Sequence, residues 1–405
     1  MFSRKQTRSL KVGNLPVGGG APVSVQTMGN ADPHDAAACL RQLLSCAERG
    51  CDLFRLTVPD VAAARVLGEV KKASPIPVVA DIHFDYRCAL AALEAGADAL
   101  RLNPGNIGSR DRVQAVARAA KAKGVPIRIG VNGGSLERGE TLVSSALKHL
   151  KLLEDEGFYD VVISAKASNV AETQATYREL AEKTDCPLHL GVTEAGTLLP
   201  GAVRSSVALG ILLSEGIGDT IRVSLTSKPE KEVKVGLEIL RALGLRAPGP
   251  AITSCPTCGR TKVDLMSVAA QVEEALDVLY RDWGNNRIVE SSNDRMVGCA
   301  NNRIVELSSD RMVGCANNRI VELSSDRMGE GAERNSRIRD SEIRRFPKVA
   351  VMGCAVNGPG EAKGADIALC GGAGEFLLYV RGRFVEKVSE SEAVRKVVEH
   401  VVSFE

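Results

Sequence analysis

The sequence predicts an α/β chain in which a (β/α)8 TIM-like barrel over residues 1–250 is followed by a smaller α+β domain over residues 251–405. Short apolar, β-branched runs alternate with amphipathic helical stretches along the first 250 residues. There are eight such runs, and eight βα units of this length fit a closed parallel barrel. The alternation stops at Ala247-Pro248-Gly249-Pro250, which we interpret as a domain boundary.

The candidate strands of the barrel are separated by segments long enough to form helices. They are Val23–Met28, Asp52–Val58, Val78–Phe84, Ala99–Asn103, Ile127–Asn132, Val161–Ala167, Leu188–Thr193 and Thr220–Leu225. Asp32 followed by Pro33 predicts the N-cap and first position of the first helix, and Gly50 and Gly124 predict two helix ends. An open, doubly wound sheet is the alternative, but no G-x-G-x-x-G follows the first strand to support it.

The second domain begins with a cysteine pair and continues with a helical stretch, Val263–Tyr280. A strand at Val349–Met352, a hairpin around Gly382 and a closing helix follow much later. Between them, at about 284–346, a 16-residue unit close to NNRIVELSSDRMVGCA recurs nearly verbatim. We predict a flexible surface insertion there, because the segment is polar and nearly balanced in charge. A partner-binding arm and a short β-repeat are the alternatives.

The composition is typical of a globular protein without an export signal. Hydrophobic residues make up 44% of the chain and the formal net charge is +2, so nothing points to nucleic acid or to a membrane surface. Residues 1–20 lack the apolar core of a signal peptide, and no apolar run reaches the length of a membrane span. We therefore expect the 11 cysteines to be reduced thiols or metal ligands in the cytoplasm.

Two cysteine motifs far apart in the sequence carry the strongest chemical signal. SCPTCGR at 254–260 places Cys255 and Cys258 at C-x-x-C spacing, and MGCAVNGPGE at 352–361 supplies Cys354 and Glu361. Three soft thiolates suit an iron–sulfur cluster or zinc. The alternative is a structural zinc ribbon completed by Cys299 and Cys315, but their separation is too long for a short zinc knuckle.

Polar residues inside the apolar barrel strands indicate a second site, because active sites of such barrels lie at the carboxyl ends of the strands. Four cations are expected to converge there: Arg55, Arg101, Arg128 and Lys166. Buried cations need a counter-ion, and arginine forks match phosphate oxygens, so a phosphate or diphosphate ligand is predicted. Pairing of each arginine with a carboxylate such as Asp81 or Glu194 is the alternative. Glu194 is also a candidate acid/base group.

Seven stretches of the chain carry a resemblance to a known family. They are ADIHFDYR (80–87), LRLNPGNIG (100–108), IRIGVNGGSLE (127–137), SAKAS (164–168), GVTEAG (191–196), SCPTCGR (254–260) and VMGCAVNGPGEA (351–362). With these stretches the chain resembles the bacterial 4-hydroxy-3-methylbut-2-enyl diphosphate synthase family of the methylerythritol phosphate route to isoprenoids. The matching stretches span nearly the whole chain outside residues 284–346.

The resemblance implies an oxidoreductase that opens the ring of 2-C-methyl-D-erythritol 2,4-cyclodiphosphate and removes a hydroxyl group. The product would be (E)-4-hydroxy-3-methylbut-2-enyl diphosphate, with electrons passing from ferredoxin or flavodoxin through a [4Fe–4S] cluster. It further implies Glu194 as the acid/base group, and a homodimer in which one subunit's cluster domain closes over the other's barrel. The implied cluster ligands are Cys255, Cys258, Cys354 and Glu361. The implied diphosphate ligands are Arg55, Arg101, Arg128, Asn132, Lys166 and Ser224.

Two features depart from the pattern of the family. Its hydroxyl-rich run after the first strand is replaced here by QTMGNADP at 26–33, and the repeat insertion interrupts the cluster domain. A hypothesis from another functional class is a non-catalytic barrel whose zinc-ribbon domain and repeat arm bind a partner. Iron and sulfide in protein purified without oxygen would decide between the two.

Overall fold

The computed structural model describes residues 3–136, 138–246, 249–250, 252–283 and 346–404, with the short segments 288–289, 297–300, 303–308 and 311–314. The chain divides into two compact units, Met1–Ala247 and Pro248–Glu405. Among the described residues, no helix is both long enough and apolar enough to cross a lipid bilayer.

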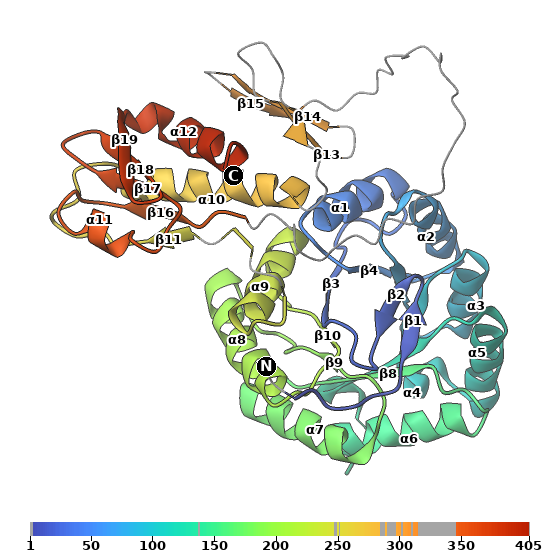
Figure 1. Ribbon diagram of the computed structural model, residues 1–405. Helices are drawn as coiled ribbons and strands as arrows, with labels where there is room; N and C mark the ends of the chain where they lie inside the picture. The colour runs from blue at the N-terminus through green and yellow to red at the C-terminus, as the bar shows by residue number, and fades with distance from the viewer. Residues whose placement is uncertain are drawn as a thin grey trace, which may run out of the picture. The chain divides into compact units, whose positions relative to one another are not determined.

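The first unit is a barrel of eight parallel strands, each followed by a helix (Figure 1). The strands are β3 (Ser24–Met28), β4 (Leu53–Thr57), β5 (Val78–Asp81), β6 (Ala99–Leu102), β7 (Ile127–Asn132), β8 (Val161–Lys166), β9 (His189–Leu190) and β10 (Thr220–Ile221). They pair in the order β8-β7-β6-β5-β4-β3-β10-β9. A parallel bridge from Ile163 to Leu188 joins the two ends of this order. The predicted TIM-like barrel is confirmed.

The helices of the barrel follow the strands in the alternation that the sequence predicts. They are α1 (Ala36–Glu48), α2 (Val61–Ala73), α3 (Tyr86–Glu94), α5 (Arg110–Lys123), α6 (Leu142–Glu154), α7 (Val170–Lys183), α8 (Leu198–Ser214) and α9 (Pro229–Ala242), with a short turn of helix, α4 (Pro104–Ile107), before α5. Gly50 and Gly124 follow the ends of α1 and α5 with φ of 87° and 63°, a conformation that glycine adopts without strain.

The predicted start of the first helix is wrong. Asp35, not Asp32, is the N-cap of α1, and its side chain accepts a hydrogen bond from the backbone N–H of Ala38. Asp32 instead belongs to a turn closed by a hydrogen bond from Asp35 N–H to the Asp32 carbonyl. The carboxylate of Asp32 is engaged by His34, whose backbone N–H donates to it at 3.0 Å.

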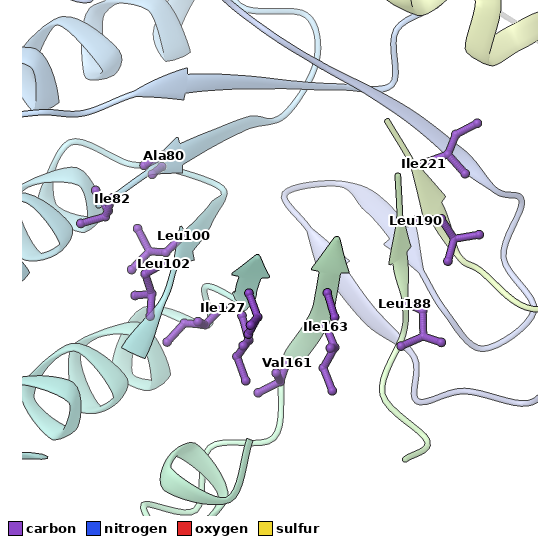
Figure 2. Close-up of a cluster of buried hydrophobic side chains, with 14 of the residues drawn as sticks. Ala80, Ile82, Leu100, Leu102, Ile127, Val161, Ile163, Leu188, Leu190 and Ile221 are labelled. Atoms are coloured by element: carbon purple, nitrogen blue, oxygen red, sulfur yellow. The ribbon is translucent and has the colours of Figure 1, made fainter. Parts of the chain in front are cut away.

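The barrel strands bury apolar side chains on the face that meets the helices. Figure 2 shows these apolar side chains on several strands, including Leu100 and Leu102 of β6 and Ile163 of β8. These side chains share one hydrophobic core with helix residues such as Leu43 and Leu67. Because successive residues of a strand point to opposite faces, the residues between them face the inside of the barrel. The predicted site arginines occupy these inward positions.

A hairpin at the N-terminus of the chain fills one part of the barrel interior. Strands β1 (Leu10–Val12) and β2 (Leu15–Val17) pair antiparallel. Their side chains form a separate apolar cluster with inward-facing residues at the start of the barrel strands, including Leu53, Val79 and Val162. The apolar residues therefore occupy the amino ends of the strands, and the polar inward residues lie toward the carboxyl ends.

The second unit is a five-stranded mixed sheet with two long helices. Its strands are β11 (Ile252–Ser254), β16 (Val349–Met352), β17 (Ile367–Gly371), β18 (Phe376–Val380) and β19 (Arg383–Val388), in that spatial order. The first three are parallel, and the last two complete an antiparallel hairpin. Helices α10 (Leu265–Trp283) and α12 (Glu390–Val402) contribute Val272, Leu276 and Val397 to its core. The predicted smaller α+β domain is confirmed.

The repeat insertion contains regular structure in the part that is described. Strands β12 (Ile288–Val289), β13 (Val297–Ala300), β14 (Arg303–Ser308) and β15 (Arg311–Gly314) form an antiparallel sheet. For these residues the short β-repeat fits better than a featureless loop. Residues 315–345, with Cys315, lie outside the described residues, and the flexibility of the insertion stays a prediction.

Candidate functional site

Four predicted cations come together at the carboxyl ends of the barrel strands. Arg101 of β6 is the register partner of Arg128 on β7, and Arg55 lies on β4 at the same end of the barrel. Lys166 ends β8. Burial lowers the pKa of Lys166 well below its usual value, and repulsion from Arg222, Arg55 and Arg128 lowers it further. The site thus gathers positive charge away from water, which favours an anionic ligand.

Asp81, the last residue of β5, is the main carboxylate among these cations. It accepts from Arg101 Nη1 at 3.1 Å and lies 3.6 Å from Arg55 Nε and 3.8 Å from His83 Nε2. Burial alone would raise the pKa of Asp81, but Arg55 and Arg101 hold it below its usual value. Asp81 is therefore an internal counter-ion for two arginines, as the alternative reading of the sequence expects.

Arg128 is held by a neutral partner and keeps donors available. Its Nη1 donates to Gln26 Oε1 at 2.6 Å, and its Nε and Nη2 atoms are buried without a hydrogen-bond partner. Burial and the neighbouring Arg55 and Arg101 lower the pKa of Arg128 well below the ordinary arginine value. Buried donors without partners are rare in folded proteins, and here they mark the place where ligand oxygens are expected.

The guanidinium of Arg55 has an unusual neighbour in β3, the first strand of the barrel. Its Nε and Nη2 atoms donate to the thioether sulfur of Met28, at 3.2 and 2.8 Å. A thioether is a weak acceptor, so it competes poorly with a phosphate oxygen. Met28 belongs to the run that departs from the hydroxyl-rich pattern of the family.

A fifth cation, Arg222, belongs to the same group but is missing from the residues predicted to bind the diphosphate. It follows β10 and pairs with Glu232 of α9 at 3.3 Å. Glu232 also accepts from Thr27 Oγ1 at 2.7 Å and from the N–H of Leu225 at 3.0 Å. Within the described part of the barrel mouth, five cations therefore face two buried carboxylates. Arg222 could have been found as a polar residue in a predicted strand, whereas Glu232 resembles an ordinary helix-surface residue.

One glycine in a barrel strand and one directly after a strand leave the space that two of the cations occupy. A Cβ added to Gly130 on β7 would lie 2.2 Å from Arg101 Nε. A Cβ added to Gly191, directly after β9, would lie 2.8 Å from Lys166 Nζ. These contacts are far shorter than van der Waals distances, so a side chain at either glycine would displace a cation from the site.

The remaining predicted barrel residues surround this cluster. Asn132 ends β7 as the register partner of Lys166, and Ser224 lies half-buried after β10. Glu194 is exposed in the loop after β9, with φ of 55°. A left-handed backbone at a residue other than glycine costs about 1–2 kcal/mol and is often found at functional sites. The strain at Glu194 is consistent with a role for its carboxylate.

The second unit brings the two cysteine motifs to one edge of its sheet. β11 and β16 are parallel neighbours in which Ser254 pairs with Val351. Cys255 directly follows β11, and Cys354 comes two residues after β16. Between them, the backbone N–H of Gly353 donates to the sulfur of Cys255 at 3.2 Å. The predicted ligands therefore lie in adjacent loops.

The environment of these loops favours thiolates. Hydrogen bonds from the backbone and side chain of Arg260 lower the pKa of Cys258, and backbone N–H groups after Cys354, from Asn357 first, lower the pKa of Cys354. Cys258, Cys354 and then Glu361 raise the pKa of Arg260, so all three acidic groups lie near enough to this guanidinium to interact with its charge. Thiolates are the ligands of iron–sulfur and zinc sites, so the residues present fit such a group.

The candidate cluster ligands lie in neighbouring loops, but their side chains are not arranged around a common point. Among the described residues, no three His, Cys, Asp or Glu side chains already lie close enough together to enclose a metal ion. Cys370, on β17 of the same sheet, is buried in an apolar cluster with Met352 and Ala368. Burial raises the pKa of Cys370 to about 11, which favours a packed thiol over a ligand.

Comparison with known proteins identifies the family. Residues 7–237 match the GcpE TIM-barrel domain, which is more than half of the chain. This chain belongs to the GcpE family. Residues 327–403 match the GcpE protein C-terminal domain. The GcpE barrel match contains every barrel residue of the candidate site, and the C-terminal match contains Cys354 and Glu361.

Relatives from several bacteria are similar to this GcpE chain over nearly their whole length. The 4-hydroxy-3-methylbut-2-en-1-yl diphosphate synthase (flavodoxin) of Geobacter sulfurreducens is 45% identical, with 98% of each chain covered. The protein of the same name from Maridesulfovibrio salexigens is 45% identical, over 97% of this chain and 94% of the relative. That from Symbiobacterium thermophilum is 44% identical, over 99% and 94%. These relatives are named as enzymes, which disfavours the non-catalytic alternative.

Proposed function

We propose that this chain is an oxidoreductase that forms 4-hydroxy-3-methylbut-2-en-1-yl diphosphate, as its relatives are named to do. The observation that carries the proposal is the 45% identity to such synthases over 98% of both chains. The substrate is 2-C-methyl-D-erythritol 2,4-cyclodiphosphate. Two electrons and a proton convert it to the open-chain diphosphate, one ring carbon–oxygen bond breaks, and a hydroxyl group leaves as water.

The barrel mouth binds the diphosphate in this proposal. Arg128 offers two buried donors without partners, and Arg55 exchanges the weak thioether acceptor of Met28 for a phosphate oxygen. The excess of cations over carboxylates is neutralised by the ligand, which lowers the cost of burying them. The proposed substrate-binding residues are Arg55, Arg101, Arg128, Asn132, Lys166 and Ser224. We add Arg222, because its charge acts on Arg55 and lowers the pKa of that residue.

Glu194 is the proposed acid/base group. Its loop follows β9 at the carboxyl end of the barrel, next to the strand that ends in Lys166. A carboxyl group there can pass a proton to the departing hydroxyl group, and Lys166 and the arginines keep the diphosphate in place during the transfer. The left-handed backbone at Glu194 supports this role, because such strain is often found at functional sites.

Membership of the family implies an iron–sulfur cluster, and we propose a [4Fe–4S] cluster held by Cys255, Cys258, Cys354 and Glu361. Such a cluster supplies single electrons at low potential. The chain's own part is to lower the pKa of the thiols of Cys258 and Cys354, through hydrogen bonds from the groups around them, which favours the thiolate. Glu361 is the oxygen ligand, harder than sulfur and thus more easily exchanged at iron. The proposed electron donor is flavodoxin or ferredoxin.

We further propose that the chain forms a homodimer. Helix α8 leaves an apolar stripe exposed, formed by Leu199, Val203, Val207 and Ile211, which are 74, 54, 47 and 39% exposed. Residues four apart lie on one face of a helix, so this stripe can pack against its own copy. Light scattering should show a dimer for the unsubstituted chain and a monomer for Val203→Asp.

The division of work between the parts of the chain follows from these roles. The barrel, residues 1–250, binds the substrate, and residues 251–405 carry the cluster, with the insertion at about 284–346 as an interruption. The free cysteines of the described part are consistent with a reducing compartment, and we place the enzyme in the cytoplasm.

Product formation tests the proposed function. The anaerobic holoenzyme is incubated with the cyclodiphosphate and reduced flavodoxin, and phosphorus NMR follows the substrate. We expect the two ring phosphorus signals to be replaced by those of an open-chain diphosphate ester, at a rate that depends on flavodoxin. An unchanged substrate spectrum with a fully loaded cluster would contradict the proposal.

A further inference from the structure

The loop after β3 and the loop after β4 are joined through one imidazole. His34 Nδ1 lies 3.1 Å from Asp32 Oδ1, and His34 Nε2 lies 3.0 Å from Asp60 Oδ2. Asp32 belongs to the first of these loops and Asp60 to the second, where it is also the N-cap of α2. Both loops lie at the carboxyl end of the barrel, on the side of the substrate site.

The geometry of this contact requires a protonated ring. A neutral imidazole carries a single N–H and can donate to only one carboxylate, whereas imidazolium donates to both. Asp60 first and Asp32 second raise the pKa of His34 above its ordinary value of 6.5. The ring in turn lowers the pKa of Asp32 and Asp60, after the backbone N–H groups that both carboxylates accept from. Among the residues that the structure describes, Asp60 and Asp32 are the charged groups that act on the ring.

The same loop begins at the substrate site. The N–H of Gly29 donates to the carbonyl of Arg55 at 2.9 Å, and the sulfur of Met28 accepts a hydrogen bond from the guanidinium of Arg55. Asn30 is fixed by Gln42, which accepts from its backbone N–H at 2.8 Å and donates to its side chain at 2.6 Å. The segment from Met28 to Asp32 therefore connects Arg55, which is proposed to bind the diphosphate, to the imidazole of His34.

We propose that His34 is a positioning residue: as imidazolium it clamps the first βα loop to the second, and so keeps the backbone N–H of Gly29 on the carbonyl of Arg55, at the strand end that carries this arginine. The role in substrate binding rests on the proposed function, whereas the clamp itself does not. Because the pKa of His34 is raised in the clamped state, the clamp is complete below about pH 6.5 and is lost as the pH rises through the raised value. Loss of the clamp loosens the loop and weakens substrate binding.

Hydrogen exchange on the full-length anaerobic protein measures the clamp without turnover. Protection factors of peptides covering residues 29–35 are compared between about pH 6 and pH 8.5, a range that spans histidine titration. We expect protection to fall with rising pH in the unsubstituted chain and to be low at both values in His34→Gln. His400→Gln, the same change on α12 of the other unit, is the matched control and should behave like the unsubstituted chain.

A second variant separates the charge from the fold. Asp60→Asn keeps an oxygen to accept from Ala63 N–H at the start of α2, but removes one of the two charges that face His34. We expect the midpoint of the protection change to move to lower pH in Asp60→Asn. The KM for the cyclodiphosphate should rise about 3- to 10-fold in His34→Gln at pH 6, with kcat changing less, because the loop acts on binding.

Two results would overturn the inference. One is equal protection of residues 29–35 in His34→Gln and the unsubstituted chain at pH 6. The other is an unchanged KM in a His34→Gln protein whose loop is demonstrably loosened, which would sever the clamp from the substrate site. Failure of the unsubstituted chain to convert the cyclodiphosphate, with its pH-dependent protection intact, would refute the proposed function and uphold the clamp.

Discussion

The side-chain oxygen of Gln26 accepts a hydrogen bond from Arg128 Nη1 at 2.6 Å, and the two residues are only 1 and 6% exposed. Gln26 lies on β3 and Arg128 on β7, so the bond crosses the interior of the barrel. It uses one donor of the guanidinium and leaves Nε and Nη2 for a ligand. A neutral acceptor orients the cation without cancelling its charge.

Replacing Gln26 by leucine should therefore destabilise the chain in the absence of substrate. Leucine removes the acceptor and leaves a buried charged donor unpaired, which costs on the order of 1–3 kcal/mol. Urea unfolding would show a lower midpoint at an unchanged m-value. Because substrate supplies the missing oxygens, saturating cyclodiphosphate should recover part of the loss. A stability equal to that of the unsubstituted chain would mean that Arg128 has another partner.

Arg128→Ala should weaken binding of the cyclodiphosphate about 10- to 150-fold, since a hydrogen bond to a charged group contributes about 1.5–3 kcal/mol. The cluster spectrum should not change, because the substitution lies in the barrel. Calorimetry measures the binding, with Arg118→Ala on the exposed face of α5 as the matched control. Unchanged binding in Arg128→Ala would remove this residue from the diphosphate site.

Two substitutions of Glu194 should separate its chemistry from its backbone. Glu194→Gln and Glu194→Gly both lose the acid/base group, so both should lose most turnover. Glycine accepts a φ of 55° without strain, so Glu194→Gly should be about 1 kcal/mol more stable than Glu194→Gln. Thermal unfolding compares the two proteins. Substantial activity in Glu194→Gln would show that the proton comes from elsewhere.

Glu361→Ala should retain much of the cluster but lose most turnover, because three thiolates remain and the exchangeable oxygen ligand is gone. The double substitution Cys299→Ser with Cys315→Ser should change neither the cluster content nor the turnover. These two cysteines lie in Val-Gly-Cys-Ala sequences that are similar to the Met-Gly-Cys-Ala sequence around Cys354. Iron content and turnover of both proteins provide the test. Loss of iron from the double variant, beside a fully active Glu361→Ala, would reverse the assignment.

Deleting the repeat insertion from Asn285 to about Arg339 should preserve the cluster and keep the unfolding free energy within about 1 kcal/mol, the range typical of surface changes. The two ends of the deleted segment both lead into the second unit, whose sheet and helices are formed by other residues. Cluster absorbance and thermal unfolding of the shortened chain measure the outcome. Insoluble protein would indicate that the insertion packs against the core.

The sequence predicted the fold because the barrel repeats one local pattern. The sequence places all eight barrel strands near their observed positions, since amphipathic helical stretches separate the successive apolar runs. The last two strands are shorter than predicted: β9 and β10 have two residues each. After β9 the chain reaches Glu194, whose left-handed backbone is incompatible with a strand, and hydrophobicity does not reveal this change.

The site could be predicted only in part, because several of its contacts depend on long-range packing. Arg55, Arg101 and Arg128 stood out as charges inside apolar strands. Glu232 did not, because its burial comes from the packing of α9 against β3, where Thr27 lies. The sequence places the N-cap of α1 at Asp32, but the Asp32 carboxylate accepts a hydrogen bond from His34 N–H before the helix begins. The second partner of the His34 ring, Asp60, is distant in the sequence.

The metal content of the purified protein tests the central claim most directly. Protein prepared without oxygen is assayed for iron, acid-labile sulfide and zinc. The account predicts a brown protein with about four iron and four sulfide per chain, in keeping with one [4Fe–4S] cluster. A colourless protein that holds stoichiometric zinc, and takes up no iron and sulfide on reconstitution, would contradict it.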